Sequence, residues 1–222
     1  MELLNFESML AQIKKIPATR RMAVAGAADP HVIQSILAAK KDRIAVPVLV
    51  GDAEKIKGIL LDLGEDAAEF HIVNNLPGKN EAETAVELLR SGDANFLMKG
   101  MMETSSFLRP VVRTDNGLRT GRAMSHIAFH HLPGWRKMMV ITDGGMYPYP
   151  DLKGKKEIIA NVLDTLCRIG YEFPKIACIC CKETADPKMP ETMDALALKQ
   201  ACAAGELGSC FVEGPISYDI AM

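Results

Sequence analysis

Short aliphatic runs alternate with longer segments in which apolar side chains recur every three to four positions. In the first half of the chain, the runs are residues 21–25, 45–50, 70–73 and 94–98. Between them lie helical patterns: one that begins at Asp29-Pro30, one at residues 53–63 and one at residues 80–90. Strands of nearly continuous aliphatic character that alternate with helices predict a parallel sheet covered on both faces. The pattern therefore predicts an α/β fold.

The second half of the chain repeats this alternation less regularly. Strands are predicted at residues 125–129, 137–141, 176–180 and 209–212, and helices at residues 153–169 and 191–204. Residues 216–222 have the pattern of a helix start without a stop signal, so we expect the chain to end within an element. Two α/β domains are predicted, residues 1–120 and residues 121–222, the second incomplete.

Residues 1–16 have apolar side chains at helical spacing, with acidic residues early and lysines late. An amphipathic helix is predicted there and not a signal peptide, because the segment lacks an unbroken apolar core. Nowhere does the sequence approach the run of about 18 apolar residues that a membrane span needs. These features predict a cytoplasmic protein that does not bind membranes.

Composition and charge exclude several other classes. The 222 residues are 48% hydrophobic, and their formal net charge is -2, which argues against a general nucleic-acid binder. The cluster at residues 178–181, Cys-Ile-Cys-Cys, lacks the spacing of a zinc site and is predicted to lie on a buried strand. Half-buried histidines are favoured over a metal site at residues 126–131. Only one glycine stands where a dinucleotide fingerprint needs three, so an NAD-dependent enzyme is the weakest alternative.

Candidate chemistry is concentrated in residues 99–122, which carry five cations against two anions. Lys99 and Gly100 directly follow the strand at 94–98, and Thr104 and Ser105 precede a helix predicted at 107–112. A hydroxyl-rich turn between a strand and a helix presents unpaired backbone N–H groups to an anion, and the helix dipole favours such binding.

Two arginines extend this candidate site. Arg109 and Arg113 are four residues apart, so they would share one face of a helix, and guanidinium groups can bind phosphate through two parallel hydrogen bonds. The equally weighted alternative is a solvated basic helix surface. Pro110 lacks an N–H donor, so an undisturbed helix is not expected here.

Asp143 follows the strand predicted at 137–141 and is a further candidate. It either faces a cleft at the carboxyl end of that strand or caps the following turn, and the sequence favours neither role. Glu213 ends another strand in the same way, and there a structural turn is favoured.

Five motifs resemble those of the phosphate acetyl/butyryltransferases, and most closely the phosphate butyryltransferase branch. They are LMKGMMETSSFLRPVV at 97–112, GLRTGRAMSHIAF at 117–129, VITDGGM with YPDL at 140–152, DPKMPETMDALAL at 186–198 and VEGPISYDIA at 212–221. They follow the order of that family along most of the chain.

The resemblance implies two α/β/α domains with mainly parallel sheets, like the isocitrate and isopropylmalate dehydrogenases. It also implies the reversible reaction of acyl-CoA and phosphate to acyl phosphate and CoA, without a metal or redox cofactor. By the same resemblance Arg109 holds phosphate, and Lys99, Gly100, Thr104 and Ser105 contact phosphate or CoA. Family members usually form homo-oligomers.

The resemblance also implies that the family's chain continues beyond residue 222. The continuing segment carries a Ser-Arg-Gly motif and an aspartate, proposed to stabilise the reacting carbonyl and to deprotonate the CoA thiol. Their absence predicts a C-terminally incomplete acyltransferase. The alternative is a non-catalytic protein that binds CoA or phosphate.

Overall fold

A computed structural model describes residues 5–15, 20–75 and 78–222 of the chain. These residues form two compact units, Leu10–Thr120 and Gly121–Met222, and the described residues before Leu10 group with the latter. We call Leu10–Thr120 the sheet unit and Gly121–Met222 the second unit. The first helix, α1, spans Phe6–Ile13. Residues 1–4 and 16 of the helix predicted at the start of the chain lie outside the described residues.

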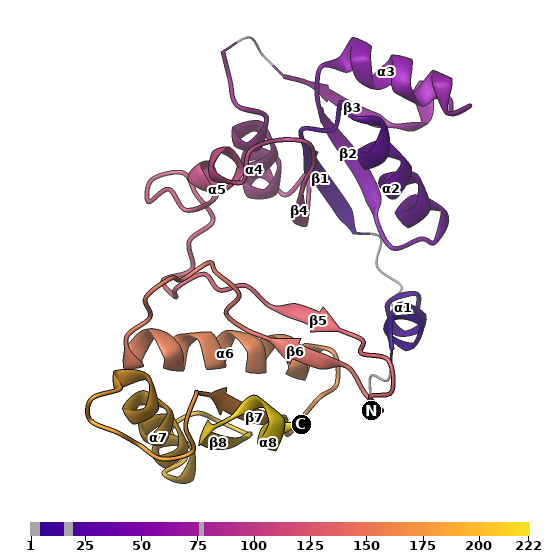
Figure 1. Ribbon diagram of the computed structural model, residues 1–222. Helices are drawn as coiled ribbons and strands as arrows, with labels where there is room; N and C mark the ends of the chain where they lie inside the picture. The colour runs from indigo at the N-terminus through magenta and orange to yellow at the C-terminus, as the bar shows by residue number, and fades with distance from the viewer. Residues whose placement is uncertain (1–4, 16–19, 76–77) are drawn as a thin grey trace. The chain divides into compact units, whose positions relative to one another are not determined.

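The sheet unit is built on four parallel strands (Figure 1). They are β1 (Arg21–Ala25), β2 (Val46–Gly51), β3 (His71–Asn74) and β4 (Phe96–Lys99), in the order β3-β2-β1-β4. The central strand β1 pairs with β2 on one side and β4 on the other, so that Ala23 lies opposite both Val48 and Leu97. The parallel sheet predicted from the aliphatic runs is confirmed.

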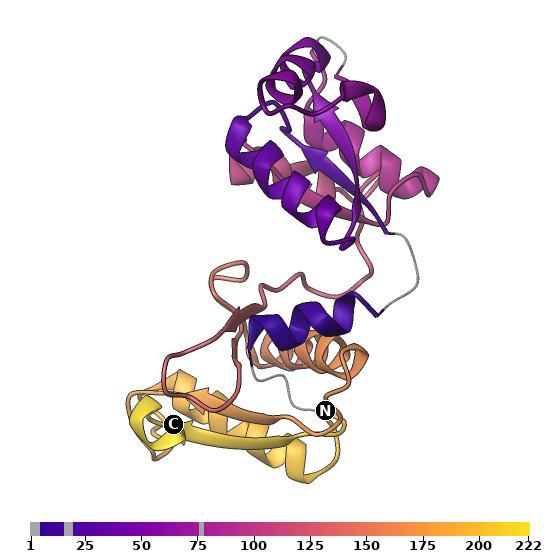
Figure 2. The same cartoon turned by 90° about the vertical axis from the view of Figure 1, so that its right-hand side faces the viewer.

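Helices cover both faces of this sheet, which makes the unit a three-layer α/β/α structure (Figure 1 and Figure 2). The helical elements are α2 (Pro30–Lys41), α3 (Ala53–Asp62), the short 3-10 helix η1 (Ala67–Glu69), α4 (Glu81–Ser91) and α5 (Thr104–Val111). Side chains alternate along β1, so Met22 and Val24 pack under α2 and α3, and Ala23 and Ala25 pack under α4. Because both faces are buried, β1 carries apolar residues almost throughout.

Four helices, α2, α3, α4 and α5, begin at the carboxyl edge of this sheet. In three of the four, a side chain caps the first turn: Asp29 for α2, Asp52 for α3 and Asn80 for α4. The capping oxygens accept hydrogen bonds from the first backbone N–H groups, which would otherwise lack partners. Only α5, among the helices of the described part of this unit, has no such cap.

The second unit contains two small sheets and two long helices. Strands β5 (Ala128–His130) and β6 (Met139–Ile141) are antiparallel, whereas β7 (Lys175–Ile179) and β8 (Phe211–Ile216) are parallel. Helices α6 (Leu152–Arg168) and α7 (Pro190–Ala203) enclose a core with β8, and α8 (Tyr218–Ala221) follows it. Parallel pairing therefore holds for only one of the two pairs in this unit.

The cysteine-rich strand differs from the prediction. Exposed and half-buried residues alternate along β7, none of its residues is fully buried, and Cys181 beyond it is exposed. The strand pairs on one side only, with β8, so its second edge has no neighbour among the described residues. A local aliphatic pattern cannot report how many neighbours a strand has, which is why the prediction of a buried strand is wrong here.

The described residues contain neither a membrane-spanning helix nor a cluster of metal ligands. No helix among them is long and apolar enough to cross a membrane. No group of three or more His, Cys, Asp or Glu side chains within the described ranges is arranged to hold a metal ion.

Candidate phosphate-binding site

Two backbone turns pack directly on one another at the carboxyl edge of the parallel sheet. Gly100 N donates to Ala25 O at 2.8 Å, and Met101 N donates to Gly26 O at 3.0 Å. Gly100 is buried, and a Cβ atom at this position would collide with Gly26 O and lie 2.9 Å from Ala25 O. These contacts fix the direction in which the chain leaves β4, and only glycine fits at position 100.

The helix that follows starts earlier than the sequence predicts and has an open first turn. Helix α5 begins at Thr104, and its N-cap residue Glu103 makes no side-chain hydrogen bond to it. The N–H groups of Thr104, Ser105 and Ser106 have no acceptor among the described residues. Together with the helix dipole they form an exposed array of donors, as an anion site requires. Thr104 and Ser105, predicted as residues before the helix, lie within its first turn.

Lys99 is the last residue of β4 and lies beside this turn. Its Nζ atom donates to Met102 O at 2.9 Å, in the loop that leads into α5. The hydrogen bond uses one of three ammonium protons, so the charge and two donors are still available. Lys99 therefore both stabilises the loop and adds positive charge near the start of α5.

Arg109 is the candidate with the most available charge. It lies in the last turn of α5, it is exposed, and its guanidinium has no hydrogen bond or ion pair within the described residues. Arg109 is four residues after Ser105, so the two share a face of the helix. Helical side chains lean toward the N-terminus, so we expect the guanidinium to reach back along that face toward the first turn.

Arg113 lies in a different environment. Helix α5 ends at Val111, so Arg113 is beyond it, and the predicted helical face shared with Arg109 is wrong. Its guanidinium contacts Glu83 of α4 at 3.2 Å and Asp115 at 3.4 Å. The backbone N–H groups of Asp115 and Asn116 donate to the Asp115 carboxylate and lower its pKa, and the nearby charge of Arg113 lowers it further. Two carboxylates therefore already compensate the charge of Arg113.

Asp143 belongs to the second unit, where it caps a turn. Its Oδ1 atom accepts from the backbone N–H groups of Gly145 and Met146, each at 2.8 Å. Burial raises the pKa of Asp143, but hydrogen bonds from Met146, Gly145 and other backbone groups outweigh it and lower the pKa overall. Its Oδ2 atom is buried without a partner among the described residues. A contact between Asp143 and substrate stays a prediction.

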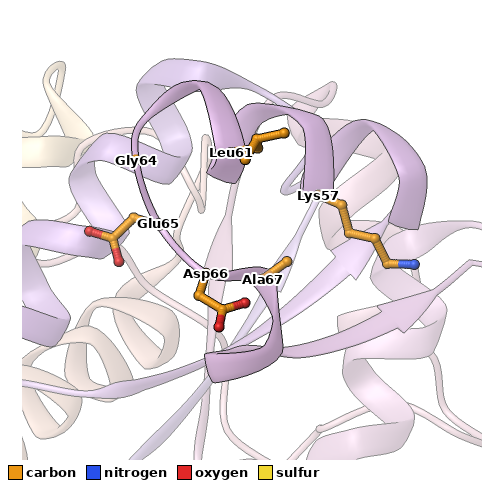
Figure 3. A pocket seen from close by; sticks show the side chains of 6 residues that line it. All are labelled: Lys57, Leu61, Gly64, Glu65, Asp66 and Ala67. Carbon is orange, nitrogen blue, oxygen red and sulfur yellow. The ribbon is translucent and has the colours of Figure 1, made fainter.

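An open surface hollow of the sheet unit lies elsewhere. Figure 3 shows the side chains of Lys57, Leu61, Glu65, Asp66 and Ala67 around an open depression of about 510 Å³ at the end of α3. Helix α3 begins at the carboxyl edge of the sheet and runs antiparallel to the strands. Its last turn therefore lies toward the amino edge. The depression is thus separate from the turn at Lys99 and Gly100.

Glu81 marks a second electrostatic feature of the carboxyl edge. It is the first residue of α4, and burial, followed by the charge of Asp52, raises its pKa. A raised pKa means that the folded state holds the proton more tightly than the unfolded chain does. The free energy of unfolding consequently falls as pH rises from the ordinary pKa of a glutamate through the raised pKa of Glu81. This loss of stability persists at neutral pH.

Glu81→Gln should therefore raise the free energy of unfolding at pH 7, with a smaller effect at pH 4, where Glu81 is largely protonated. Urea unfolding at both pH values measures this difference. Glu65→Gln, at a carboxyl group without an ion pair among the described residues, is the control and should change stability little at either pH. Equal effects of Glu81→Gln at the two pH values would contradict the assignment.

Sequence reasoning missed Asn80 as part of this site. Its Oδ1 atom caps α4 through Ala82 N at 2.9 Å, and its Nδ2 atom donates to Ser106 O of α5 at 3.0 Å. The capping half was readable, because Asn80 opens the predicted helix. The contact with a residue 26 positions away has no local signal in the sequence.

The fold and these residues define an α/β protein with an uncapped helix start at the carboxyl edge of a parallel sheet. Residues 69–222 match the family model described as phosphate acetyl/butaryl transferase. Over 218 residues the chain is 39% identical to the phosphate butyryltransferase of Clostridium acetobutylicum, covering 98% of this chain and 72% of the relative. It is 32% identical over 200 residues to the phosphate acetyltransferase of Thermotoga maritima, covering 90% of this chain and 68% of that protein. The chain belongs to the phosphate acetyl/butaryl transferase family, which confirms the resemblance.

Solved structures agree at the level of the fold. A branched-chain phosphotransacylase from Enterococcus faecalis V583 aligns with a TM-score of 0.74 and 24% identity, over 91% of this chain and 70% of that one. A phosphotransacetylase from Streptococcus pyogenes aligns with a TM-score of 0.78 and 16% identity, over 98% of this chain and 75% of that one. The α/β fold class is confirmed.

Proposed function

We propose that this chain is a phosphate acyltransferase that moves a short acyl group between CoA and inorganic phosphate. The family match and the relatives named for phosphate butyryl and phosphate acetyl transfer support this activity. The observation that carries it is the uncapped first turn of α5, whose three N–H groups have no acceptor among the described residues, with Lys99 beside it and Arg109 on the same helix. Among the described helix starts of the sheet unit, this one is open to an anion.

The reaction suits such a site. A phosphate oxygen attacks the thioester carbonyl of acyl-CoA, the new C–O bond forms, and the C–S bond breaks to release CoA. Phosphate must be held while it attacks, and the thioester must lie close to the phosphate. The backbone N–H groups and the cations lower the barrier because they orient the phosphate. We assign phosphate binding to Arg109 with the N–H groups of Thr104 and Ser105, and charge neutralisation to Lys99. Gly100 sets their geometry.

Arg113 has a structural role in this proposal. Its ion pairs with Glu83 and Asp115 link the end of α5 to α4. We also propose that no metal or redox cofactor takes part, because phosphate attack on a thioester needs neither electrons nor a Lewis acid when cations are already placed. Action in the cytoplasm, as a homo-oligomer, completes the proposal; the amphipathic pattern of residues 1–16 supports the first and the family resemblance the second.

A thiol-release assay tests the activity. The purified chain is given butyryl-CoA with and without phosphate, and free CoA is followed against a blank without protein. Release that depends on phosphate and saturates with it is the expected result. A folded protein that binds phosphate by calorimetry but releases no CoA would overturn the enzymatic proposal in favour of a binding protein. Repeating the assay with acetyl-CoA compares the two acyl chains, which differ by two methylenes.

A further inference from the structure

Pro110 leaves a gap in the hydrogen bonding of α5. In an α-helix the N–H of residue 110 would donate to the carbonyl of residue 106, but proline has no N–H. Pro110 is nevertheless inside the helix and buried. The carbonyl of Ser106, in the first turn of α5, therefore lacks its usual partner.

The side chain of Asn80 supplies that missing donor. Asn80 Nδ2 lies 3.0 Å from Ser106 O, and Asn80 Oδ1 accepts from Ala82 N at 2.9 Å. One amide thus caps α4 and completes the hydrogen bonding of α5. The two functions fix which end of the amide is oxygen, because Ala82 offers a donor and Ser106 an acceptor.

We propose that Asn80 is a positioning residue that sets the orientation of the anion-binding first turn of α5. This inference rests on the proposed function, because it assigns a residue to the same phosphate site. Helix carbonyls point toward the C-terminus and N–H groups toward the N-terminus, so Asn80 acts on the side of the turn away from the free N–H groups. It steadies Ser106, and through it the N–H groups of Thr104 and Ser105, without contacting phosphate.

Other contacts cannot replace this one. Phe107 packs against the cluster that contains Ala82 and Ala85, which fixes the distance of α5 from the sheet. Arg113 and Glu83 join the far end of α5 to α4. Apolar packing is not directional, and the ion pair lies beyond Val111. The Asn80 amide is the directional contact between α4 and the first turn of α5 among the described residues.

Asn80→Ser tests the proposal, because serine caps helices nearly as well as asparagine but is too short to reach Ser106. The variant should raise both KM and Kd for phosphate about tenfold while kcat stays within about twofold. Pro110→Ala should change them little. In the double variant Asn80→Ser/Pro110→Ala, the alanine N–H can donate to Ser106 O, so KM and Kd should return to within about threefold of the parent.

Asn116→Ser is the matched control. Asn116 Oδ1 accepts from Arg90 at 2.9 Å, so this substitution also removes an amide that joins α4 to the segment after α5, but far from the first turn. KM for phosphate should be unchanged. An unchanged KM in Asn80→Ser, or a double variant as impaired as Asn80→Ser, would overturn the inference.

The two proposals fail in different ways. If the parent binds phosphate but releases no CoA, acyl transfer is rejected, and the calorimetric Kd values of the parent and its variants still decide the role of Asn80. If the parent releases CoA and Asn80→Ser matches it, the function stands and the inference is rejected. If the parent binds no phosphate, both are rejected.

Discussion

Gly100→Ala is expected to destabilise the protein by about 3 kcal/mol or more, at the upper end of what overpacking costs. A Cβ atom at this position would collide with Gly26 O and lie 2.8 Å from Gly26 C. Both are backbone atoms, so no side-chain rotation can relieve the overlap. The Met101 N–H donates to Gly26 O and so holds the turn after β1 in place.

Urea unfolding measures the effect, with Gly58→Ala as the control. Gly58 lies within α3 and has open space where a Cβ would be, so alanine there should stabilise the protein by roughly 0.5 to 1 kcal/mol. The two variants add the same methyl group and are expected to change stability in opposite directions. If the free energy of unfolding of Gly100→Ala lay within about 1 kcal/mol of that of the parent, the two turns would be able to separate, and the prediction would fail.

Arg109→Ala should produce the largest loss of substrate binding. Charge-assisted hydrogen bonds contribute about 1.5 to 3 kcal/mol, so KM for phosphate should rise roughly 10- to 150-fold. The guanidinium makes no ion pair within the described residues, so its removal leaves no carboxylate without a partner. Stability should therefore hardly change.

Two further variants make this prediction specific. Arg109→Lys keeps the charge but cannot form two parallel hydrogen bonds with phosphate, so its KM should lie between those of the parent and Arg109→Ala. Arg21→Ala removes the same charge at the amino edge of the sheet, where Arg21 begins β1, and should leave KM unchanged. If Arg21→Ala raised KM as much as Arg109→Ala, a general loss of positive charge would explain the effect and the assignment of Arg109 would fail.

Several features of the protein follow from local sequence. Each strand of the parallel sheet was predicted within two residues at either end, because a strand buried on both faces is aliphatic at nearly every position. The position of Lys99 and Gly100 at the end of β4 followed from the same pattern. The family, too, could be inferred from motifs that keep their order along the chain, and the comparisons confirm it.

Only the tertiary structure determined which contacts the candidate residues make. Arg109 and Arg113 look equivalent in sequence, yet one is free of ion pairs among the described residues and the other contacts Glu83, 30 positions earlier. The open first turn of α5 depends on Glu103 not folding back to cap it. The role of Asn80 depends on packing that brings α4 and α5 together. Hydrophobic pattern is a local property and sets the elements, whereas partners distant in the chain are chosen by packing, which no local pattern encodes.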